Sequence, residues 1–285
     1  MTMPFACPRC EAPLSADASL IRCSNCGPYP LLGGVPVLLS DPFTYCHAYR
    51  DSILATLAEH DAADRTAVAV VDAFARGQSA SEVFADDWTA HEANREDAPR
   101  PSHATLRKLM QESQKNGPAA WLAKRVKNAR TVLEIGCGAG ERSEVLAAAA
   151  DELIIADRSL RAVLQATRRA QAANPESNIS GVVLDAVELP VRPRSADVIV
   201  AEHLVDLLDE PQEFLDRARV ALRKGGRLLV TTPEPSLGSD DDSALETLAK
   251  NSKFKVVSRA DGLPWLRVNS ARFVEVYLVQ ALELA

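Results

Sequence analysis

The sequence lacks any run of about 18 consecutive apolar residues, so we expect no transmembrane helix. Its first residues also lack a basic segment followed by an apolar stretch, so we expect no secretory signal peptide. Positive charge is in deficit, because 32 lysines and arginines stand against 39 acidic residues, for a net charge of −7. This deficit argues against a broad nucleic-acid-binding face. Together these absences favour a cytoplasmic protein that makes no contact with a membrane.

The six cysteines are unevenly distributed, and four of them form two C-x2-C pairs near the N-terminus. In a reducing compartment such cysteines are metal ligands or free thiols rather than disulfides. Two tight turns brought together by a hairpin make a tetrahedral four-thiolate zinc site, and metal binding supplies the folding free energy that so short a segment lacks. We therefore predict a structural zinc ribbon over residues 1–42, with the ligands Cys7, Cys10, Cys23 and Cys26.

The ribbon segment carries a second signal in its sequence, CPRC-x2-PL followed by IRCSNCG-x-YPLLGGVPVLL. This pattern resembles the small zinc-binding activator subunit of tRNA, rRNA and release-factor methyltransferases. The resemblance implies that residues 35–39 form a strand that packs on the partner domain. It also implies that this chain carries its activator in cis and requires no separate activator subunit. A nucleic-acid-binding zinc ribbon is the alternative.

Residues 126–285 alternate short apolar runs with helical patterns. Runs of this kind, bounded by Gly, Asp or Pro, are typical of strands buried on both faces of a parallel sheet. The runs lie at 131–135, 153–156, 181–184, 198–201, 227–231, 254–258 and 273–282, with helical patterns at 141–150, 161–173 and 210–222. The last two runs follow each other directly, which fits an antiparallel finish. The sequence thus predicts an α/β, Rossmann-like fold, a doubly wound and mostly parallel sheet of seven strands.

A glycine-rich loop, E-I-G-C-G-A-G over residues 134–140, follows the first predicted strand. Glycines let the backbone turn tightly and approach a ligand, and the helix that follows presents its N-terminal amides. The spacing is not the G-x-G-x-x-G of dinucleotide-binding loops, because residue 141 is Glu. It resembles motif I of class I S-adenosylmethionine-dependent methyltransferases, of the type 11-like group. The resemblance implies that this domain binds S-adenosylmethionine.

The ends of the later strands extend this resemblance over residues 120–285. Asp157, at the end of the second strand, can accept hydrogen bonds from both ribose hydroxyls. The stretch D-A-x-x-L-P at residues 185–190 resembles the adenine contact, and the stretch after the fourth strand resembles the segment that closes over the methionine moiety. The cofactor-binding residues that follow from this are Glu134, Gly136, Cys137, Gly138, Gly140, Asp157, Arg158, Asp185, Ala186 and Glu202.

The catalytic side chains are harder to predict, because the methyl group of a sulfonium donor is already activated and the enzyme mainly positions the acceptor. A general base is needed only for a poor nucleophile such as a hydroxyl. His203 follows the fourth strand, and its neutral form can take a proton from a hydroxyl or an amine. The alternative is a histidine that only hydrogen bonds near the methionine tail. His91 is either part of a cap over the site or an ordinary surface histidine.

A motif that the sequence lacks bears on the identity of the methyl acceptor. Methyltransferases that act on planar exocyclic amines or glutamine side chains typically carry N-P-P-[YF] after the fourth strand, and residues 201–208 lack it. That stretch looks more like small-molecule enzymes of the ubiquinone-biosynthesis type, so a small-molecule acceptor is the first hypothesis. An rRNA or tRNA methyltransferase is the second and a non-catalytic scaffold the third. We expect residues 43–125 to form a helical linker or cap over the cleft.

Overall fold

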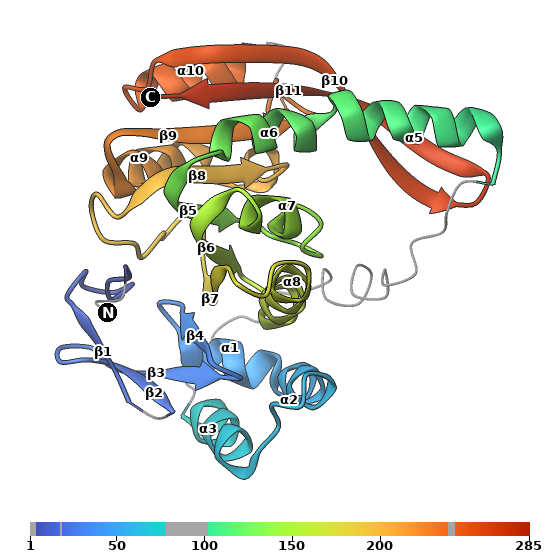
Figure 1. The fold of residues 1–285 in the computed structure, drawn as a ribbon. Helices are drawn as coiled ribbons and strands as arrows, with labels where there is room; N and C mark the ends of the chain where they lie inside the picture. The colour runs from blue at the N-terminus through green and yellow to red at the C-terminus, as the bar shows by residue number, and fades with distance from the viewer. Residues whose placement is uncertain (1–3, 18, 78–101, 239–242) are drawn as a thin grey trace.

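The computed structural model describes residues 4–17, 19–77, 102–238 and 243–285. Within these ranges the strands form one eleven-stranded sheet, in the order β1-β2-β3-β4-β7-β6-β5-β8-β9-β11-β10 (Figure 1). The sequence predicts seven strands, and seven come from residues 126–285. The other four belong to the N-terminal segment, which joins the same sheet at one edge. No helix in the described ranges is long and apolar enough to cross a membrane.

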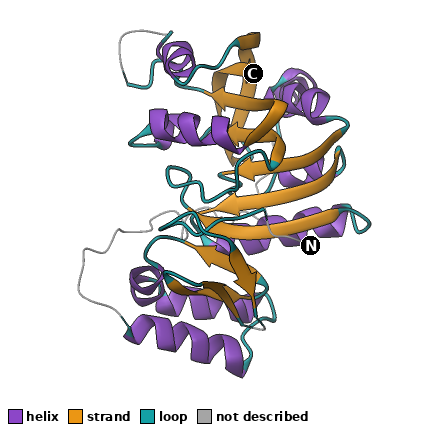
Figure 2. Cartoon of the chain, turned by 90° about the vertical axis from the view of Figure 1, so that its left-hand side faces the viewer, coloured by secondary structure: helices purple, strands orange, loops and turns teal. Residues whose placement is uncertain are grey.

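Five of the seven central strands run parallel, and the last two complete the sheet in antiparallel pairing. Helices lie on both faces (Figure 2), which is why the central strands consist of continuous apolar runs. The sheet is therefore mixed and doubly wound. The seven strands are β5 (Ala129–Ile135), β6 (Ala150–Asp157), β7 (Asn178–Leu184), β8 (Ala196–Glu202), β9 (Leu222–Thr232), β10 (Val256–Ser270) and β11 (Phe273–Leu284).

Two apolar clusters fill the spaces between the sheet and its helices. One lies beneath α6 (Pro118–Val126), α7 (Ser143–Ala147) and α8 (Leu160–Ala173). The other lies beneath α9 (Pro211–Ala221) and α10 (Ala244–Asn251). Alternate residues of each strand enter opposite clusters, as the pleat requires. One predicted helix is too long: residues 141–150 contain only the short α7, because β6 already begins at Ala150.

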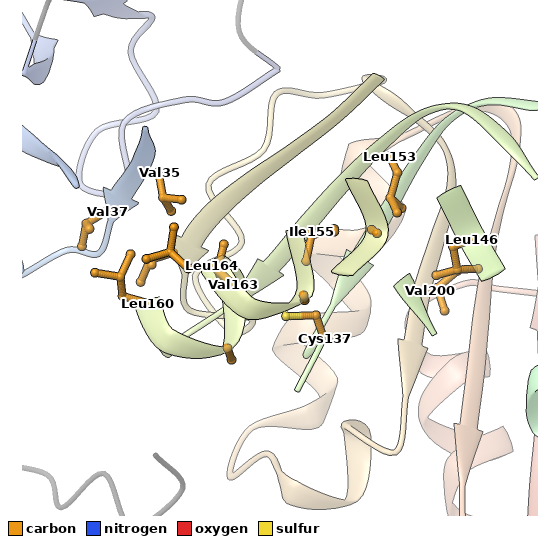
Figure 3. Close-up of a cluster of buried hydrophobic side chains, with 14 of the residues drawn as sticks. Val35, Val37, Cys137, Leu146, Leu153, Ile155, Leu160, Val163, Leu164 and Val200 are labelled. Atoms are coloured by element: carbon orange, nitrogen blue, oxygen red, sulfur yellow. The ribbon is translucent and has the colours of Figure 1, made fainter. Parts of the chain in front are cut away.

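The N-terminal segment contributes β1 (Leu14–Ala16), β2 (Leu20–Cys23), β3 (Gly27–Leu32) and β4 (Val35–Leu38). Strand β4 pairs in parallel with β7, Val37 opposite Val183, and so continues the central sheet. Val35 and Val37 lie in the same apolar cluster as Leu160, Val163 and Leu164 of α8 (Figure 3). The strand that the family resemblance implies at residues 35–39 is therefore present and packs on the doubly wound region.

The ribbon also covers the part of the second face that lies beside the connection from β7 to β8. The connection from β7 to β8, residues 185–195, is described throughout and contains no helix. On that face Phe5, Cys7 and Tyr29 join the buried cluster formed by Leu184 and Leu189. One antiparallel bridge, between Phe5 and Val191, fixes the contact, and beside it Ala6 N–H donates to the Pro190 carbonyl at 3.0 Å. The ribbon thus takes the place of a crossover helix.

The described helices between the ribbon and β5 form two groups. The first, α1 (Pro42–Ala48), α2 (Arg50–Glu59) and α3 (Arg65–Arg76), packs against β3 and α8, and the second, α5 (Ala104–Asn116) with α6, packs against β10. Residues 78–101, which include His91, lie outside the described residues. The helical character predicted for residues 43–125 is therefore present where it is described, whereas a cap over the cleft stays a prediction.

The β10–β11 hairpin is longer than the sequence predicts. The apolar run at 254–258 indicates only a short strand, but β10 extends to Ser270 and remains paired along β11, with Trp265 opposite Tyr277. Gly, Pro and charged residues interrupt the apolar pattern here. Most residues of the β10–β11 hairpin are exposed or only partly buried. Cross-strand pairing rather than core burial therefore maintains the hairpin.

Candidate functional site

The glycine-rich loop after β5 has a backbone that only glycine accommodates easily. Gly136, Gly138 and Gly140 have φ of +74°, +51° and +78°. A Cβ on Gly140 would lie 2.5 Å from the Ala166 Cα in α8, and a Cβ on Gly136 would lie 3.1 Å from a Leu204 methyl carbon. The loop is therefore held tightly between α8 and the segment after β8, as close backbone approach requires.

Asp157, at the end of β6, contacts this loop directly. Gly138 N–H donates to its Oδ2 at 3.1 Å, and Ser159 N–H donates to its Oδ1 at 3.0 Å. A carboxylate oxygen can accept more than one hydrogen bond. The arrangement fits the predicted contact with two ribose hydroxyls, and that role stays a prediction.

Beneath the loop lie two acidic side chains with different environments. Glu134 is buried, and Ser143 Oγ donates to its Oε2 at 2.6 Å. Burial raises the pKa of Glu134 to about 8, against the lowering effect of the Ser143 hydrogen bond. Glu202, at the end of β8, forms an ion pair of 2.8 Å with Arg142. Sequence reasoning identified both acids but neither Arg142 nor Ser143, because nothing local in the sequence marks these two residues as their partners.

The end of β7 supplies a third contact to the same edge. Asp185 Oδ1 accepts from Val187 N–H at 2.9 Å, and its other oxygen lies 3.5 Å from the Arg158 guanidinium. Ala186 is buried beside it. The structure therefore brings every predicted cofactor-binding residue to the carboxyl ends of β5, β6, β7 and β8, the edge where open α/β sheets bind ligands.

Cys137, within the loop, is buried in the same apolar cluster as Ile155 and Val163 (Figure 3). Burial raises the pKa of its thiol well above the ordinary value, and the neighbouring Asp157 raises it further. The thiol is therefore neutral at physiological pH. Its side chain packs inside the molecule, so its contribution to a cofactor site comes from its backbone.

His203 lies just after β8 with φ of +50°, a conformation uncommon for a residue with a side chain. Its N–H donates to the Thr231 carbonyl at 2.8 Å, which ties it to the end of β9. Its ring lies 4.3 Å from the Trp265 ring, centroid to centroid. Burial lowers the pKa of His203, so the neutral imidazole predominates at neutral pH. The Trp265 contact was not predicted, since the hairpin that carries it was not.

The second candidate site is the cysteine cluster in the ribbon. The sulfurs of Cys7, Cys10, Cys23 and Cys26 all lie within 4.8 Å of one another. Two features build the turns: Cys7 C=O accepts from Glu11 N–H at 2.8 Å, and Gly27 has φ of +97°. Four thiolates that converge in this way match the donor set of a closed structural zinc site.

The electrostatics of the cluster also favour a cation. Burial raises the pKa of Cys7, but hydrogen bonds with Tyr29 and with the amides of Arg9 and Cys10 outweigh it and lower the value to about 7. The pKa of Cys26 is raised to about 12, first by its hydrogen bond with Cys10 and then by burial and by Cys7. Negative sulfurs this close oppose one another's ionisation. A divalent ion would remove that opposition, since metal binding requires and stabilises thiolates.

A cavity of about 970 Å³ lies where the ribbon meets α9. Its walls come from the first cysteine turn, the connection after β7 and the N-terminal half of α9, and six acidic side chains line it against one arginine. Those charged residues are Glu11, Glu188, Asp209, Glu210, Glu213, Asp216 and Arg217. The lining does not include the glycine loop or Asp157, so the cavity is separate from the predicted cofactor contacts.

Comparison with known proteins places this chain near methyltransferases. Residues 133–230 match the family described as a methyltransferase domain. Two curated relatives, probable S-adenosylmethionine-dependent methyltransferases from two strains of Mycobacterium tuberculosis, are each 30% identical over 105 residues. That stretch is 37% of this chain and 36% of theirs, so the match spans about a third of the length of the curated relatives.

Similar solved structures include the N-methyltransferase NodS from Bradyrhizobium japonicum in complex with S-adenosyl-L-homocysteine. It is 20% identical, with a TM-score of 0.44, over 64% of this chain and 98% of that one. The YcgJ protein from Bacillus subtilis is 15% identical, with a TM-score of 0.46, over 58% and 95% of the two chains. The family match and the curated relatives support an S-adenosylmethionine-dependent methyltransferase as the class of the domain that contains residues 133–230.

Proposed function

We propose that this chain is an S-adenosylmethionine-dependent methyltransferase that acts on a small molecule and carries its own structural zinc ribbon. Its parts are the ribbon at residues 1–42, the helical section at 43–125 and the catalytic domain at 126–285. The ribbon already pairs with β7 and covers the sheet beside the β7–β8 connection, which contains no helix. The enzyme therefore requires no separate activator subunit.

The observation that carries the proposal is the convergence of four strand ends around the glycine loop. Gly136, Gly138 and Gly140 have positive φ and carry no side chain, so a ligand can approach the loop backbone closely, and Asp157 lies against the loop through Gly138. These residues fit the cofactor: an acid for the ribose, an open backbone for the methionine tail and Asp185 for the adenine amine. When bound, S-adenosylmethionine supplies an activated methyl group.

The protein's own contribution is binding and orientation. Arg142 holds the Glu202 carboxylate at the end of β8, and Ser143 holds the buried Glu134 under the loop. Fixed in this way, the loop can keep its shape when the cofactor binds, so that little reorganisation is needed. The acceptor then needs only to be placed in line with the methyl group and shielded from water.

The first test is calorimetric titration of S-adenosylmethionine into the zinc-loaded protein. We expect binding, and we expect Asp157→Ala to weaken it at least tenfold, about 1.4 kcal/mol. The matched control is Asp151→Ala, because Asp151 is exposed near the opposite end of the same strand and should leave the affinity unchanged.

A wild-type protein that binds no S-adenosylmethionine would contradict the proposal and favour a non-catalytic scaffold. Equal loss in both variants would point to general destabilisation rather than to a cofactor contact. An rRNA or tRNA acceptor would instead reveal itself by RNA binding that weakens steeply with added salt.

A further inference from the structure

Two buried polar atoms at the carboxyl ends of β8 and β9 have no hydrogen-bond partner in the structure. They are Nε2 of His203 and Oγ1 of Thr231. The two residues are neighbours, because His203 N–H donates to the Thr231 carbonyl at 2.8 Å and Glu202 pairs with Thr231 in the sheet. Leaving a buried polar atom without a partner is unfavourable. Two such atoms on neighbouring residues indicate that a polar group from outside the chain binds here.

Next to these atoms lies a wall of aromatic rings from the hairpin. The Trp265 ring lies 4.3 Å from the His203 ring, in an edge-on arrangement, and 4.9 Å from the Tyr277 ring. Trp265 and Tyr277 are cross-strand partners, so they project from the same face of the hairpin. The hairpin backbone beside these rings packs closely on the turn between α5 and α6, since a Cβ on Gly117 would lie 2.5 Å from the Pro264 carbonyl.

The neighbours of His203 in the sequence contact the glycine loop. Leu204, the residue after His203, contacts Gly136, because a Cβ there would lie 3.1 Å from its side chain. Gly136 is the first glycine of the loop, and Arg142, which follows the last glycine, pairs with Glu202, the residue before His203. His203 is therefore enclosed on both sides by residues that contact the loop, at the strand end where the methyl acceptor must approach.

We propose that His203, Thr231, Trp265 and Tyr277 form the acceptor-binding site, and that the acceptor is a small planar molecule bearing a hydroxyl or amine. This inference rests on the proposed function. The planar body packs on the indole and phenol rings, and its O–H or N–H donates to Nε2 of His203. Nε2 is covered in the structure, and the indole of Trp265, partly exposed on the hairpin, is the neighbour with room to move aside.

Methyl transfer to a hydroxyl acceptor conserves atoms and charge. Nε2 of His203 takes the hydroxyl proton as the oxygen lone pair forms a bond to the methyl carbon. The carbon–sulfur bond of the sulfonium breaks, and its electron pair stays on sulfur as a neutral thioether. The methyl ether leaves, and the imidazolium returns its proton to solvent. The charged groups that act on His203 are Glu202, Asp206 and Arg142, and burial outweighs them in favouring the neutral ring.

The test uses three probes and the full-length zinc-loaded protein saturated with S-adenosylhomocysteine. The probes are 2-naphthol, 2-methoxynaphthalene, which lacks the O–H, and decahydro-2-naphthol, which lacks the planar rings. We expect 2-naphthol to bind at least tenfold more tightly than either analogue. Trp265→Ala should reduce that affinity at least tenfold, whereas Phe273→Ala, an exposed aromatic on the same hairpin, should not.

A pH series separates a hydrogen-bonding role of His203 from a structural one. Affinity for 2-naphthol should fall at acid pH, below the ordinary histidine pKa because burial lowers the pKa of His203, since an imidazolium cannot accept. His203→Asn should bind weakly with no such pH dependence. S-adenosylhomocysteine affinity, measured in every variant, should stay within about twofold of wild type.

The failures are distinguishable. Wild-type protein that binds S-adenosylhomocysteine but prefers no probe, or Trp265→Ala that binds 2-naphthol normally, would overturn the acceptor site and leave the proposed function intact. Wild-type protein that binds neither S-adenosylmethionine nor S-adenosylhomocysteine would overturn both.

Discussion

The N-terminal region, residues 4–77, and the doubly wound region, residues 129–285, share one sheet but are stabilised differently. In the doubly wound region all residues of β5 except one are buried, and both faces of the sheet are covered by apolar clusters. In the ribbon β1 has no buried residue, and β2 has only two. What the ribbon has instead is a cluster of four cysteines and one strand, β4, inserted beside β7.

This difference shows that each region lacks what the other supplies. The ribbon buries little apolar area of its own, so we expect it to rely on a metal and on docking. The doubly wound region has a helix-free connection between β7 and β8 and relies on Phe5 and Tyr29 to cover that face. The two regions should therefore fail together when the ribbon fails, and respond to pH in opposite directions.

Removal of the metal should have the largest effect on the free energy of unfolding. Zinc is expected to be worth on the order of 10 kcal/mol to a small thiolate ribbon, so chelation or Cys10→Ser should lower the free energy of unfolding by several kcal/mol. Because the ribbon covers the sheet, the loss should appear in the whole molecule. Thermal unfolding and zinc content by elemental analysis measure it.

The control for that experiment is Cys46→Ala. Cys46 is buried in the apolar cluster near α8 and lies outside the four-cysteine group. It should keep full zinc content and lose only about 1 kcal/mol. If the metal-free protein unfolded with unchanged midpoint, the ribbon would not depend on metal and the comparison above would be wrong.

A smaller effect on stability should come from Glu134 in the doubly wound region, and this effect depends on pH. Its pKa is about 8 in the folded state, against 4.5 for the ordinary side chain. Between these values the unfolded chain binds fewer protons than the folded chain, so stability falls as the pH rises, by about 1.4 kcal/mol per pH unit at most. Below pH 4.5 Glu134 is protonated in both the folded and the unfolded state, so stability no longer depends on pH through this group.

Glu134→Gln should remove that slope. In urea unfolding at pH 5, 6.5 and 8, the variant should gain on the wild type as the pH rises, whereas Glu176→Gln, at an exposed acid, should not. Low pH acts on the other region, because protonation of the cysteines releases metal. A variant that tracked the wild type at every pH would show that Glu134 is ionised in the folded protein.

The smallest effect on stability should come from one hydrogen bond between the two regions. Tyr45 of α1 accepts at its hydroxyl from the Leu160 N–H, the first amide of α8, at 3.1 Å. Tyr45→Phe removes that acceptor and should cost about 1 kcal/mol in chemical unfolding. S-adenosylmethionine affinity should not change, because Asp157 keeps its contacts with Gly138 and Ser159. A cofactor affinity that fell with this variant would mean that α1 belongs to the cofactor site.

Sequence reasoning located the central strands because burial on both faces leaves continuous apolar runs, as in β8, Ala196–Glu202. It also located the loop and strand-end residues, whose types follow from geometry. It missed β10 beyond residue 258, because Asp261, Gly262 and Pro264 interrupt the apolar pattern and only the pairing with β11 keeps the strand extended. Partners such as Arg142 and Trp265 could not be predicted, since their contacts depend on tertiary folding.

The same limit applies to the union of the two regions. The sequence indicated a ribbon and a sheet, but nothing local in it specifies that β4 continues that sheet. The short β7–β8 connection is the one signal that could have helped, since 11 residues are too few for a crossover with a helix of ordinary length.

The insertion of β4 beside β7 has a consequence for synthesis of the chain. The Ser40 amide and its partner, the Glu188 carboxylate, are 148 residues apart in the sequence. At roughly 5–20 residues per second, on the order of 10 seconds pass before the ribosome delivers the partner strand. During that time the ribbon can take up its metal, but β4 presents an unpaired edge, which is a site for wrong pairing. Metal supply and chaperone access while the chain is still nascent should therefore decide how much of this protein reaches its native state.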